Sequence, residues 1–296
     1  MSHPVIAIVN PIAGAGRKRR DFVNMLASLG KGAPQVEIRE TAGPGDGRQI
    51  AASLPDETAA VVAVGGDGAV REIAEGLVDR PIPMVVWPAG TENLVARHFG
   101  FRARAAEFVN AVAQGQARVV DTGRVNGKSF LVVVGVGFDG DVAHRLQRKR
   151  NGHINHLSYA GPIMGAFFSH AFPEFSVQGD DGFQWSGRGL AFVGNMSEYA
   201  MRLPVVRDAL PDDGLLDLVI MPCHGRWGLL KHSFWTVLGK NVEQAGLIYR
   251  RIKRVRIDSP NEVPIEVDGD AFGHLPIEVE IVPRSLNVKV PAAANK

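Results

Sequence analysis

A glycine-rich turn at Gly65–Gly68, which contains Asp67, stands between two segments of strong hydrophobic pattern. Val61–Val64 is an apolar run typical of a buried strand, and the segment after the turn has the apolar spacing of a helix face at Val70, Ile73, Ala74 and Leu77. Such a loop presents bare main-chain N–H groups to an anion, and glycine lets a phosphate approach without a Cβ in the way. The stretch predicts a phosphate site. An ordinary strand-to-helix turn with a solvated Asp67 is the alternative.

The carboxylate of Asp67 makes the predicted phosphate site more specific. A carboxylate repels phosphate, so its presence indicates a metal ion or a water network between it and the ligand.

Two further loops follow apolar strand patterns in the same half of the chain. Val5–Val9 leads into Asn10–Gly16, and Ile82–Trp87 leads into Pro88–Leu94. Strand patterns alternate here with helical ones, which is the signature of a parallel sheet with both faces covered. Because ligands in open α/β sheets bind at the carboxyl ends of the strands, we expect the loops led by Asn10, Gly65 and Pro88 to converge.

From Arg118 onward the helical spacing largely disappears. Val119–Val125 and Ser129–Val136 are predicted strands around an Asn126-Gly127 hairpin turn. Further strands are predicted at Phe183–Trp185, Gly189–Val193, Leu216–Met221, Arg254–Asp258, Ile265–Val267 and Ile277–Val282. Many strands at short spacing indicate an antiparallel sandwich or a barrel-like domain.

The predicted fold is therefore α/β, with an N-terminal Rossmann-like domain and a C-terminal, mainly antiparallel β-sandwich domain. We place the first, α/β domain at residues 1–121, with the tail 284–296 returning to it, and the second, β-rich domain at 122–283. Two segments of the second domain are expected to be helical: Asn151–Phe172, and Trp227–Leu238 with Trp227, Leu230, Phe234 and Leu238 on one face. Phe167, Phe168, His170 and Phe172 are expected in the core.

Composition excludes several classes of protein. The chain of 296 residues carries a formal charge of +2, whereas a dedicated nucleic-acid binder is more strongly basic. Its single cysteine, Cys223, cannot form an internal disulfide, which fits a reducing compartment. No signal peptide and no apolar run near the ~18 residues of a membrane span are seen, so we expect a cytoplasmic protein that visits membranes peripherally. The oligomeric state is not readable from sequence.

Clusters of basic residues and histidines have ordinary as well as functional readings. The basic runs Arg17–Arg20, Arg145–Arg150 and Arg250–Arg256 would attract anionic lipid or nucleotide phosphate, or would be solvated faces. His153 and His156 have metal-ligand spacing, but no neighbouring cysteine or carboxylate completes a zinc shell.

An ordered set of motifs resembles the diacylglycerol kinase catalytic family, shared by bacterial lipid kinases and sphingosine kinases. The set spans nearly the whole chain: Asn10-Pro11 with Gly14, Gly65–Gly68, Gly90-Thr91 with Asn93, Gly137 with Asp139, Pro204 with Asp213-Gly214, Leu216 and Asp217, and Asp268-Gly269-Asp270. The turn at Gly65–Gly68 alone is a weak signal because NAD kinases are similar there, but the ordered set is a strong one.

The resemblance implies an ATP- and Mg²⁺-dependent kinase that phosphorylates a hydroxyl of diacylglycerol or a related lipid. It implies an ATP site lined by Asn10, Pro11, Ile12, Ala13, Gly14, Thr41, Gly65, Gly66, Asp67, Gly68, Ala69, Val70, Arg71 and Thr91. It also implies a structural Mg²⁺ held by Asp213 and the carbonyls of Leu210 and Leu215. A tight turn that exposes carbonyls suits a hard cation, and a plain β-turn without metal is the alternative.

The resemblance places the catalytic base in the turn Asp268-Gly269-Asp270. We expect Asp270 to be the base and Asp268 its positioning or metal-linked partner, although the two roles could be reversed. The family usually has Glu where this chain has Asp270, and other departures are Ala13, Ala69, Arg71 and Leu94. Asp is one methylene shorter than Glu, so the acceptor hydroxyl must lie closer or be reached through a water.

Two other functions are compatible with these residues. The departures from the family pattern would fit a lipid- or nucleotide-binding regulator with weakened catalysis. A soluble-substrate kinase of the NAD kinase type would share Gly65–Gly68, but no counterpart of its second NAD-binding signature is found. For the lipid kinase we expect the nucleotide to bind between the domains and the lipid to enter from the second.

Overall fold

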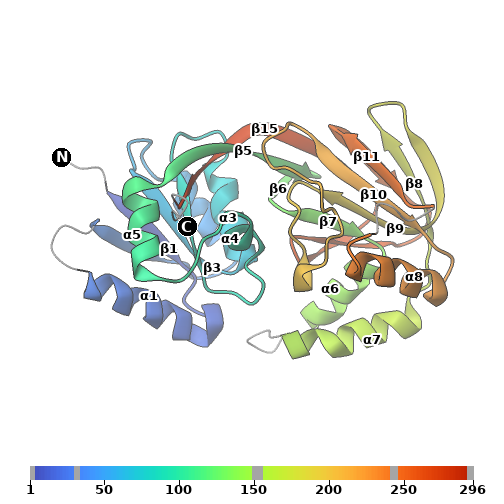
Figure 1. The fold of residues 1–296 in the computed structure, drawn as a ribbon, viewed down its shortest axis with the longest axis horizontal. Coiled ribbons are helices and arrows are strands. Elements are labelled where there is room, and N and C mark those ends of the chain that lie inside the picture. Colours follow the sequence, from blue (N-terminus) through green and yellow to red (C-terminus); the bar gives the residue numbers. More distant parts are fainter. Residues whose placement is uncertain (1–3, 30–33, 149–155, 241–245, 292–296) are drawn as a thin grey trace. The chain divides into compact units, whose positions relative to one another are not determined.

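The computed structural model describes residues 4–29, 34–148, 156–240 and 246–291 (Figure 1). The chain forms two compact units. The first contains residues 1–120 and 284–296, and the second contains residues 121–283.

The first unit alternates strands and helices along the chain, as expected from the sequence. Its elements are β1 (Val5–Val9), the 3-10 turn η1 (Ala13–Gly16), α1 (Arg17–Ser28), β2 (Val36–Glu40), α2 (Asp46–Ala52), β3 (Ala60–Gly65), α3 (Asp67–Leu77), β4 (Met84–Pro88), α4 (Leu94–His98) and α5 (Ala105–Gln114). The four strands are parallel and pair in the order β2-β1-β3-β4, and the last residues of the long strand β15 pair in parallel with β4. The predicted parallel α/β sheet is confirmed.

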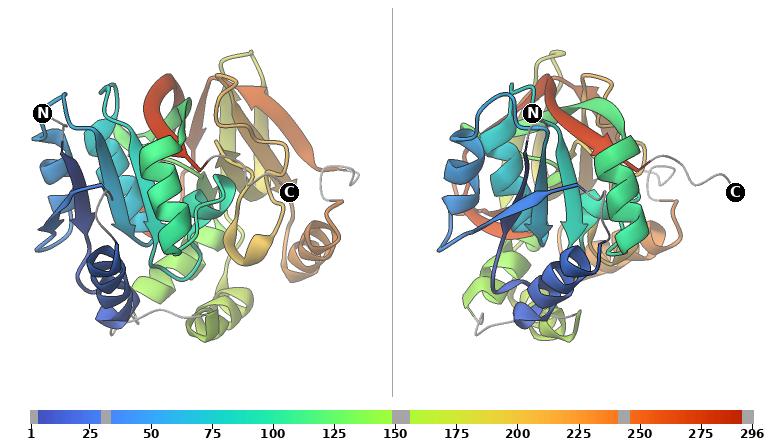
Figure 2. Two further views of the ribbon diagram at one scale, coloured as in Figure 1. Left: turned by 60° about the vertical axis from the view of Figure 1, so that its left-hand side comes forward. Right: turned by 90° about the vertical axis from the view of Figure 1, so that its left-hand side faces the viewer.

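Helices cover both faces of this sheet (Figure 2). On one face Phe22 of α1, Trp87 of β4 and Phe108 of α5 form an edge-to-face aromatic cluster with ring centroids 5.2–5.9 Å apart. Elsewhere α2 and α3 pack so closely that a Cβ on Gly76 would lie 2.4 Å from the Arg48 carbonyl oxygen. All residues of β1 and β3 are buried, which explains why their sequences are continuous apolar runs.

The second unit is mostly antiparallel sheet. Its elements are β5 (Gln116–Val125, which begins in the first unit), β6 (Lys128–Phe130), β7 (Val133–Val136), α6 (Phe138–Arg148), η2 (His156–Tyr159), α7 (Ala160–Ser169), β8 (Glu174–Gly179), β9 (Gln184–Gly194), η3 (Ala200–Arg202), β10 (Leu216–Pro222), α8 (Arg226–Val237), β11 (Ile248–Ile252), β12 (Arg254–Asp258), β13 (Pro264–Val267), β14 (Asp270–His274) and β15 (Ile277–Val290, which ends in the first unit).

Strand β9 joins the two layers of this sandwich. Its first half pairs with β8, which continues to β12 and β15, and its second half pairs with β7 and β10. Alternate residues of both layers meet in one apolar core that includes Phe130, Phe175 and Leu218. The predicted β-sandwich is confirmed.

Several predicted elements of the second unit have different limits. The predicted strand Ser129–Val136 is interrupted at Leu131-Val132, because main-chain N–H groups there bind a side chain instead of a neighbouring strand. Strands β8, β11 and β14 and helix α6 were not predicted from the sequence. The hairpin turn is confirmed, since Asn126 and Gly127 both have positive φ and connect the paired strands β5 and β6.

Expectations for the helical part of the second unit are met in part. Helix α7 lies within the predicted segment, and Phe172 is buried. Phe168 was expected in the core, but its side chain is exposed, because it projects from the outer side of α7. Lys149, Arg150 and His153 lie outside the described residues, and nothing is described of the His156 side chain.

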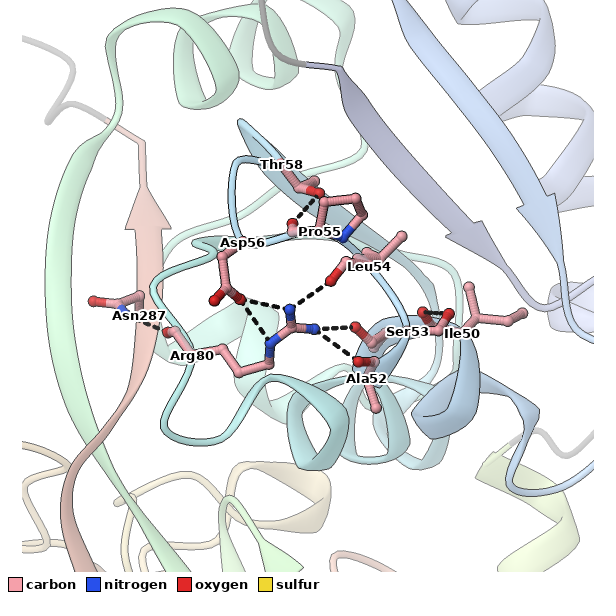
Figure 3. Close-up of polar contacts among 10 residues, drawn as sticks. Ile50, Ala52, Ser53, Leu54, Pro55, Asp56, Thr58, Arg80 and Asn287 are labelled. Carbon is pink, nitrogen blue, oxygen red and sulfur yellow. Dashed lines mark hydrogen bonds and ion pairs between the residues drawn. The ribbon is translucent and has the colours of Figure 1, made fainter.

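Arg80, just after α3, ties three segments of the first unit together (Figure 3). Its guanidinium donates to the carbonyl oxygens of Ala51 (2.9 Å), Ala52 (3.0 Å) and Leu54 (2.5 Å), and it forms an ion pair with Asp56. The main-chain oxygen of Arg80 accepts a hydrogen bond from Asn287 on the returning strand β15 (2.8 Å). The arginine thus satisfies carbonyl groups that the end of α2 leaves without helical partners.

We predict that Arg80→Met destabilises the protein by about 2–3 kcal/mol, because it leaves half-buried carbonyl oxygens unpaired. Urea unfolding of the full chain measures this change. Arg48→Met is the matched control: Arg48 is exposed and contacts Glu75 at 3.7 Å, so its loss should cost under about 0.5 kcal/mol. Equal effects of the two substitutions would contradict the role given to Arg80.

Candidate functional site

The loops that follow β1, β3 and β4 meet at the carboxyl edge of the parallel sheet. The Asn10 N–H donates to the Val64 oxygen of β3 (3.0 Å), and the Ala89 N–H donates to the Gly65 oxygen (2.9 Å). A Cβ on Gly14 would lie 3.3 Å from the Ala89 oxygen. The predicted convergence of these three loops is confirmed.

Two glycines make the closest approach between these loops. A Cβ built on Gly90 would lie only 2.5 Å from the Gly66 Cα, and one on Gly66 would lie 3.2 Å from the Gly90 Cα. Side chains at either position would push the loops apart. Asn93 holds the second loop in shape, because its Oδ1 accepts from the Gly90 N–H (2.7 Å) and its Nδ2 donates to the Gly90 oxygen (3.0 Å).

Two helices begin at this edge without a side-chain cap. The residues before α1 and α3 are Gly16 and Gly66, and neither helix has a side-chain hydrogen bond at its start. The N–H groups of a first helical turn have no acceptor within the helix, and the helix dipole adds positive potential there. These helix starts, together with the glycine loops, are suited to bind the phosphates of a nucleotide.

The remaining predicted nucleotide residues lie on the same edge. Thr41 follows β2, and its N–H donates to the Val9 oxygen (3.0 Å). Asp67 is in the first turn of α3 and accepts a long hydrogen bond from the Val95 N–H of α4 (3.4 Å). Asp67 therefore orients a neighbouring helix in addition to any role with a ligand.

The departures from the family pattern have structural explanations in part. Leu94 is buried in the first unit, so the position contributes apolar packing rather than a carboxylate. Glu92, an acidic residue close to this position in the sequence, is paired with Arg97 at 3.3 Å. Ala69 fits tightly against Gly65, where a Cβ would lie 2.5 Å from the alanine methyl group. Nothing in the structure explains Ala13.

The acidic turn of the second unit connects β13 to β14. Asp268 is buried, and its carboxylate accepts hydrogen bonds from the N–H groups of Leu131 (2.9 Å), Val132 (2.8 Å) and Val133 (3.0 Å). Asp268 and Gly269 both have positive φ, so the chain turns sharply and leaves Asp270 half-buried at the start of β14. Asp268 is thus occupied with holding the turn, and Asp270 projects from it.

A buried pair of carboxyl groups lies under this turn. Glu266 of β13 and Asp139 of α6 face each other beside Gly135, where a Cβ would lie 2.7 Å from Glu266 Oε1 and 2.6 Å from Asp139 Oδ2. Burial, followed by repulsion from Asp139, raises the pKa of Glu266 well above its usual range, and burial also raises the pKa of Asp139. The raised pKa favours the protonated form of Glu266, and its other oxygen accepts from the Gly269 N–H (2.6 Å).

Tyr199 completes this buried group. Its hydroxyl bonds to Asp139, and burial together with the two carboxyl groups raises the pKa of Tyr199 well above its usual range. Sequence reasoning singled out Asp139 without giving it a role and missed Glu266 and Tyr199. The available signal was a charged residue inside the apolar strand Pro264–Val267.

The predicted metal turn, Leu210–Leu215, is held by carboxylates. Asp213 Oδ1 accepts from the Leu215 N–H (3.0 Å), and Oδ2 forms an ion pair with Arg251. Asp121, which sequence reasoning missed, accepts from the Gly214 N–H (2.7 Å) and donates its own N–H to the Pro211 oxygen (2.6 Å).

Asp217 adds a buried carboxylate to the same region. Tyr249 donates to its Oδ1, while Oδ2 has no hydrogen-bond partner among the described residues. Burial raises the pKa of Asp217 to about 7; Arg251 opposes this rise, and Asp213 and Asp208 add to it. Carboxylate and carbonyl oxygens of this kind fit a hard cation such as Mg²⁺, provided that Arg251 moves from Asp213.

Other candidate features found in the sequence are accounted for by local contacts. In the run Arg250–Arg256, Arg251 pairs with Asp213, Arg254 with Glu278 and Glu280, and Arg256 with Asp258. Within the described parts of the chain, no three His, Cys, Asp or Glu side chains are arranged to hold a metal ion. A cation site would therefore depend on main-chain carbonyls. None of the described helices has the length and apolar character needed to cross a bilayer.

Comparison with known proteins covers both units. A family model described as the diacylglycerol kinase catalytic domain matches residues 4–125, and one described as the YegS C-terminal NAD kinase beta sandwich-like domain matches residues 132–290. A protein named diacylglycerol kinase from Mycobacterium tuberculosis is 30% identical over 294 residues, covering 97% of this chain and 95% of that one. The chain belongs to the diacylglycerol kinase family.

Further members of the family are similar over most of their length. A diacylglycerol kinase of Bacillus subtilis is 24% identical over 289 residues (96% of this chain, 95% of that one), and a Pseudomonas aeruginosa protein named "Probable lipid kinase YegS-like" is 28% identical over 265 residues (88% and 86%). A crystal structure titled as a diacylglycerol kinase from Bacillus anthracis covers 98% of each chain with a TM-score of 0.71 and 20% identity, which supports the fold. The enzyme class expected from sequence, a lipid kinase that transfers phosphate to an alcohol group, is confirmed as the class of this family.

We predict that Glu266→Gln weakens the pH dependence of stability. A carboxyl group whose pKa is raised by folding stabilises the native state least at high pH, so the contribution of Glu266 declines as pH rises above about 4.3. Between pH 5 and pH 8 the unfolding free energy of the variant should fall less than that of the wild type, by up to about 1.4 kcal/mol per pH unit. Urea unfolding at several pH values measures this difference.

Glu262→Gln, an exposed position just before β13, is the matched control and should leave the profile unchanged. Parallel profiles for wild type and Glu266→Gln would show that Glu266 is ionised in the native state and would refute the protonated pair.

Proposed function

We propose that the protein transfers the γ-phosphate of ATP to a hydroxyl of diacylglycerol or a related lipid, with Mg²⁺. The observation that carries this proposal is the meeting of three glycine-containing loops and two uncapped helix starts at one edge of the first unit. Membership of the diacylglycerol kinase family supports the lipid acceptor.

The proposed nucleotide site uses the residues predicted from sequence. Asn10–Gly14 and Gly65–Arg71 would line the phosphate site, with Thr41 and Thr91 at the same edge. Arg71, half-buried in α3, adds positive charge that offsets the negative charge of the phosphates. In this arrangement Asp67 links the phosphates to the protein through metal-bound or bridging water.

Asp270 is the proposed general base. As the lipid hydroxyl oxygen attacks the γ-phosphorus, its proton passes to the Asp270 carboxylate, a new P–O bond forms, and the bond to ADP breaks. Asp268 and Glu266 are positioning residues, because their oxygens bind the main chain on both sides of the catalytic residue. Half-burial of Asp270 leaves its carboxylate accessible to an acceptor.

We propose that Asp213, with the carbonyl oxygens of Leu210 and Leu215, holds a structural Mg²⁺. The bound ion would offset the negative charge that Asp213 and Asp217 concentrate at this turn. Asp121 would then hold the turn in place through its bonds to Pro211 and Gly214.

A regulator without catalytic activity is the second candidate. The buried Leu94 favours it, because the loop after β4 lacks a carboxylate there and Glu92 is paired with Arg97. Binding of ATP or lipid without turnover across a lipid panel would identify this function. Phosphorylation of NAD in place of lipid would identify the NAD kinase type.

We predict that Asp270→Asn lowers the rate of lipid phosphorylation by at least about 10²-fold, because the acceptor loses its base. The assay incubates the full chain with labelled ATP, Mg²⁺ and mixed micelles of diacylglycerols and related lipids. Asp258→Asn on β12 is the control and should retain activity, since Asp258 forms its ion pair with the neighbouring surface residue Arg256. A wild type that transfers no phosphate to any lipid, or an Asp270→Asn variant with full activity, would contradict the proposal.

We predict that MgCl₂ raises the melting temperature of the nucleotide-free wild type but not that of Asp213→Asn. Stabilisation at tenfold excess of Mg²⁺ over its Kd should be about 1.4 kcal/mol. Arg251→Gln removes the competing cation and should bind Mg²⁺ more tightly than the wild type. The same response to Mg²⁺ in wild type and Asp213→Asn would place the ion elsewhere.

A further inference from the structure

Helix α8 presents an apolar face to the outside of the second unit. Trp227, Leu230, Phe234 and Val237 recur at helical spacing, and their exposed fractions are 86%, 45%, 61% and 68%. Leu238, just after the helix, extends the same face and is also exposed. A surface helix of a globular protein normally turns its apolar stripe toward the core. In α8 the apolar stripe faces outward instead.

The inward face of α8 is held by polar contacts as well as by packing. His232 Nε2 donates to the Pro222 oxygen (3.0 Å), and the Thr236 hydroxyl donates to the His232 oxygen (2.9 Å). Leu229 is the buried apolar anchor. The orientation of the helix is therefore fixed, and its aromatic side chains cannot turn inward without breaking these bonds.

Helix α7 extends the apolar surface. Arg226, at the start of α8, donates to the Phe168 oxygen of α7 (2.6 Å), and its guanidinium lies 5.5 Å from the centroid of the Phe168 ring. Phe168 and Met164 of α7 are both more than half exposed. These contacts join the end of α7 to the start of α8. We call the exposed side chains Met164, Phe168, Trp227, Leu230, Phe234 and Val237 the α7–α8 apolar surface.

Neither helix of this surface carries an Asp or Glu. Helix α7 has no charged residue, and Arg145, which lies beside it, is paired with Asp141 at 2.8 Å. Helix α8 carries Arg226 and Lys231. On the loop beside the end of α8, Asp208 is paired with Arg207, which also donates to the Gly239 oxygen (2.6 Å).

We infer that the α7–α8 apolar surface docks on the surface of an anionic lipid bilayer. Exposed tryptophan and phenylalanine favour the boundary between head groups and acyl chains, and flanking cations are attracted to anionic head groups. Exposed apolar side chains gathered on one helix face mark an interaction site. The fixed helix places these aromatic side chains on the bilayer without refolding.

Charge selects the bilayer over a second copy of the chain. Self-association through this face would bring Arg226 and Lys231 of each copy close to those of the other, with no carboxylate on either helix to pair with them. An anionic lipid surface supplies the opposite charge. The biological value of this docking rests on the proposed function, since a diacylglycerol substrate is itself a bilayer component.

Vesicle binding tests this inference without any turnover. The full chain is sedimented with phosphatidylcholine vesicles that contain or lack phosphatidylglycerol, at low and high salt. We predict that Trp227→Ser with Phe234→Ser weakens binding at least about tenfold in both kinds of vesicle. Lys231→Gln should weaken binding about fivefold only when phosphatidylglycerol is present, and high salt should remove that difference.

Matched variants separate docking from general damage. Trp227→Phe should retain binding, and Lys253→Gln, an exposed cation between β11 and β12, should have no effect. Trp227 is the most exposed of the 4 tryptophans, so its fluorescence should shift to the blue on vesicle addition, and Trp227→Phe should remove most of that shift. Unchanged vesicle binding by the double variant would overturn the inference. So would loss of a dimer in sedimentation velocity with vesicle binding intact.

Kinase assays distinguish this inference from the proposed function. The double variant should be impaired on diacylglycerol in vesicles but should match the wild type on a dispersed short-chain diacylglycerol. Wild-type vesicle binding without phosphorylation of either substrate would refute the proposed function and leave the docking surface supported. Equal losses on both substrates would refute docking as the role of these side chains.

Discussion

A buried carboxylate that accepts three main-chain N–H groups fixes the geometry on which the second unit depends. Asp268 binds the N–H groups of Leu131, Val132 and Val133, and so it interrupts the predicted strand at Leu131-Val132 while closing the turn between β13 and β14. A charged group is tolerated in a protein interior only when it is paired in this way. The turn that carries Asp270 is consequently rigid, and a rigid support is what a positioned general base requires.

The buried pair of carboxyl groups beneath that turn, Asp139 and Glu266, is accommodated instead by raised pKa values. Asp139 and Glu266 meet where Gly135 leaves room, without a cationic side chain among the causes of their raised pKa values, which favours a proton on the pair. Burying a proton costs less than burying a second negative charge. One oxygen of Glu266 then remains free to hold the Gly269 N–H. Glu266, Asp268 and Asp270 are close together in the sequence, but their roles differ because their surroundings differ.

The first unit positions its loops by backbone contact rather than by side chains. Gly66 and Gly90 approach so closely that neither can carry a Cβ, and this contact brings loops from β3 and β4 to one edge. Bare backbone at that edge is the chemistry that phosphate binding uses. The second unit instead presents side chains: Asp270 on its turn and the aromatic residues of α8 on its surface.

Sequence alone determined the features that depend on local pattern. The strands β1 and β3, the glycine turn at Gly65–Gly68, the Asn126-Gly127 hairpin and the helix at Trp227–Leu238 follow from apolar periodicity and turn chemistry, which act over a few residues. The family followed from the order of motifs, and the proposed site residues stay predictions. Tertiary structure decided which way each pattern faces. A stripe of Trp227, Leu230 and Phe234 reads the same whether it is buried or exposed, and only the packing of Leu229, His232 and Thr236 turned it outward. The partners of Asp268 and Glu266 could not be predicted from local sequence pattern either, because Leu131 and Asp139 are more than a hundred residues away in the chain.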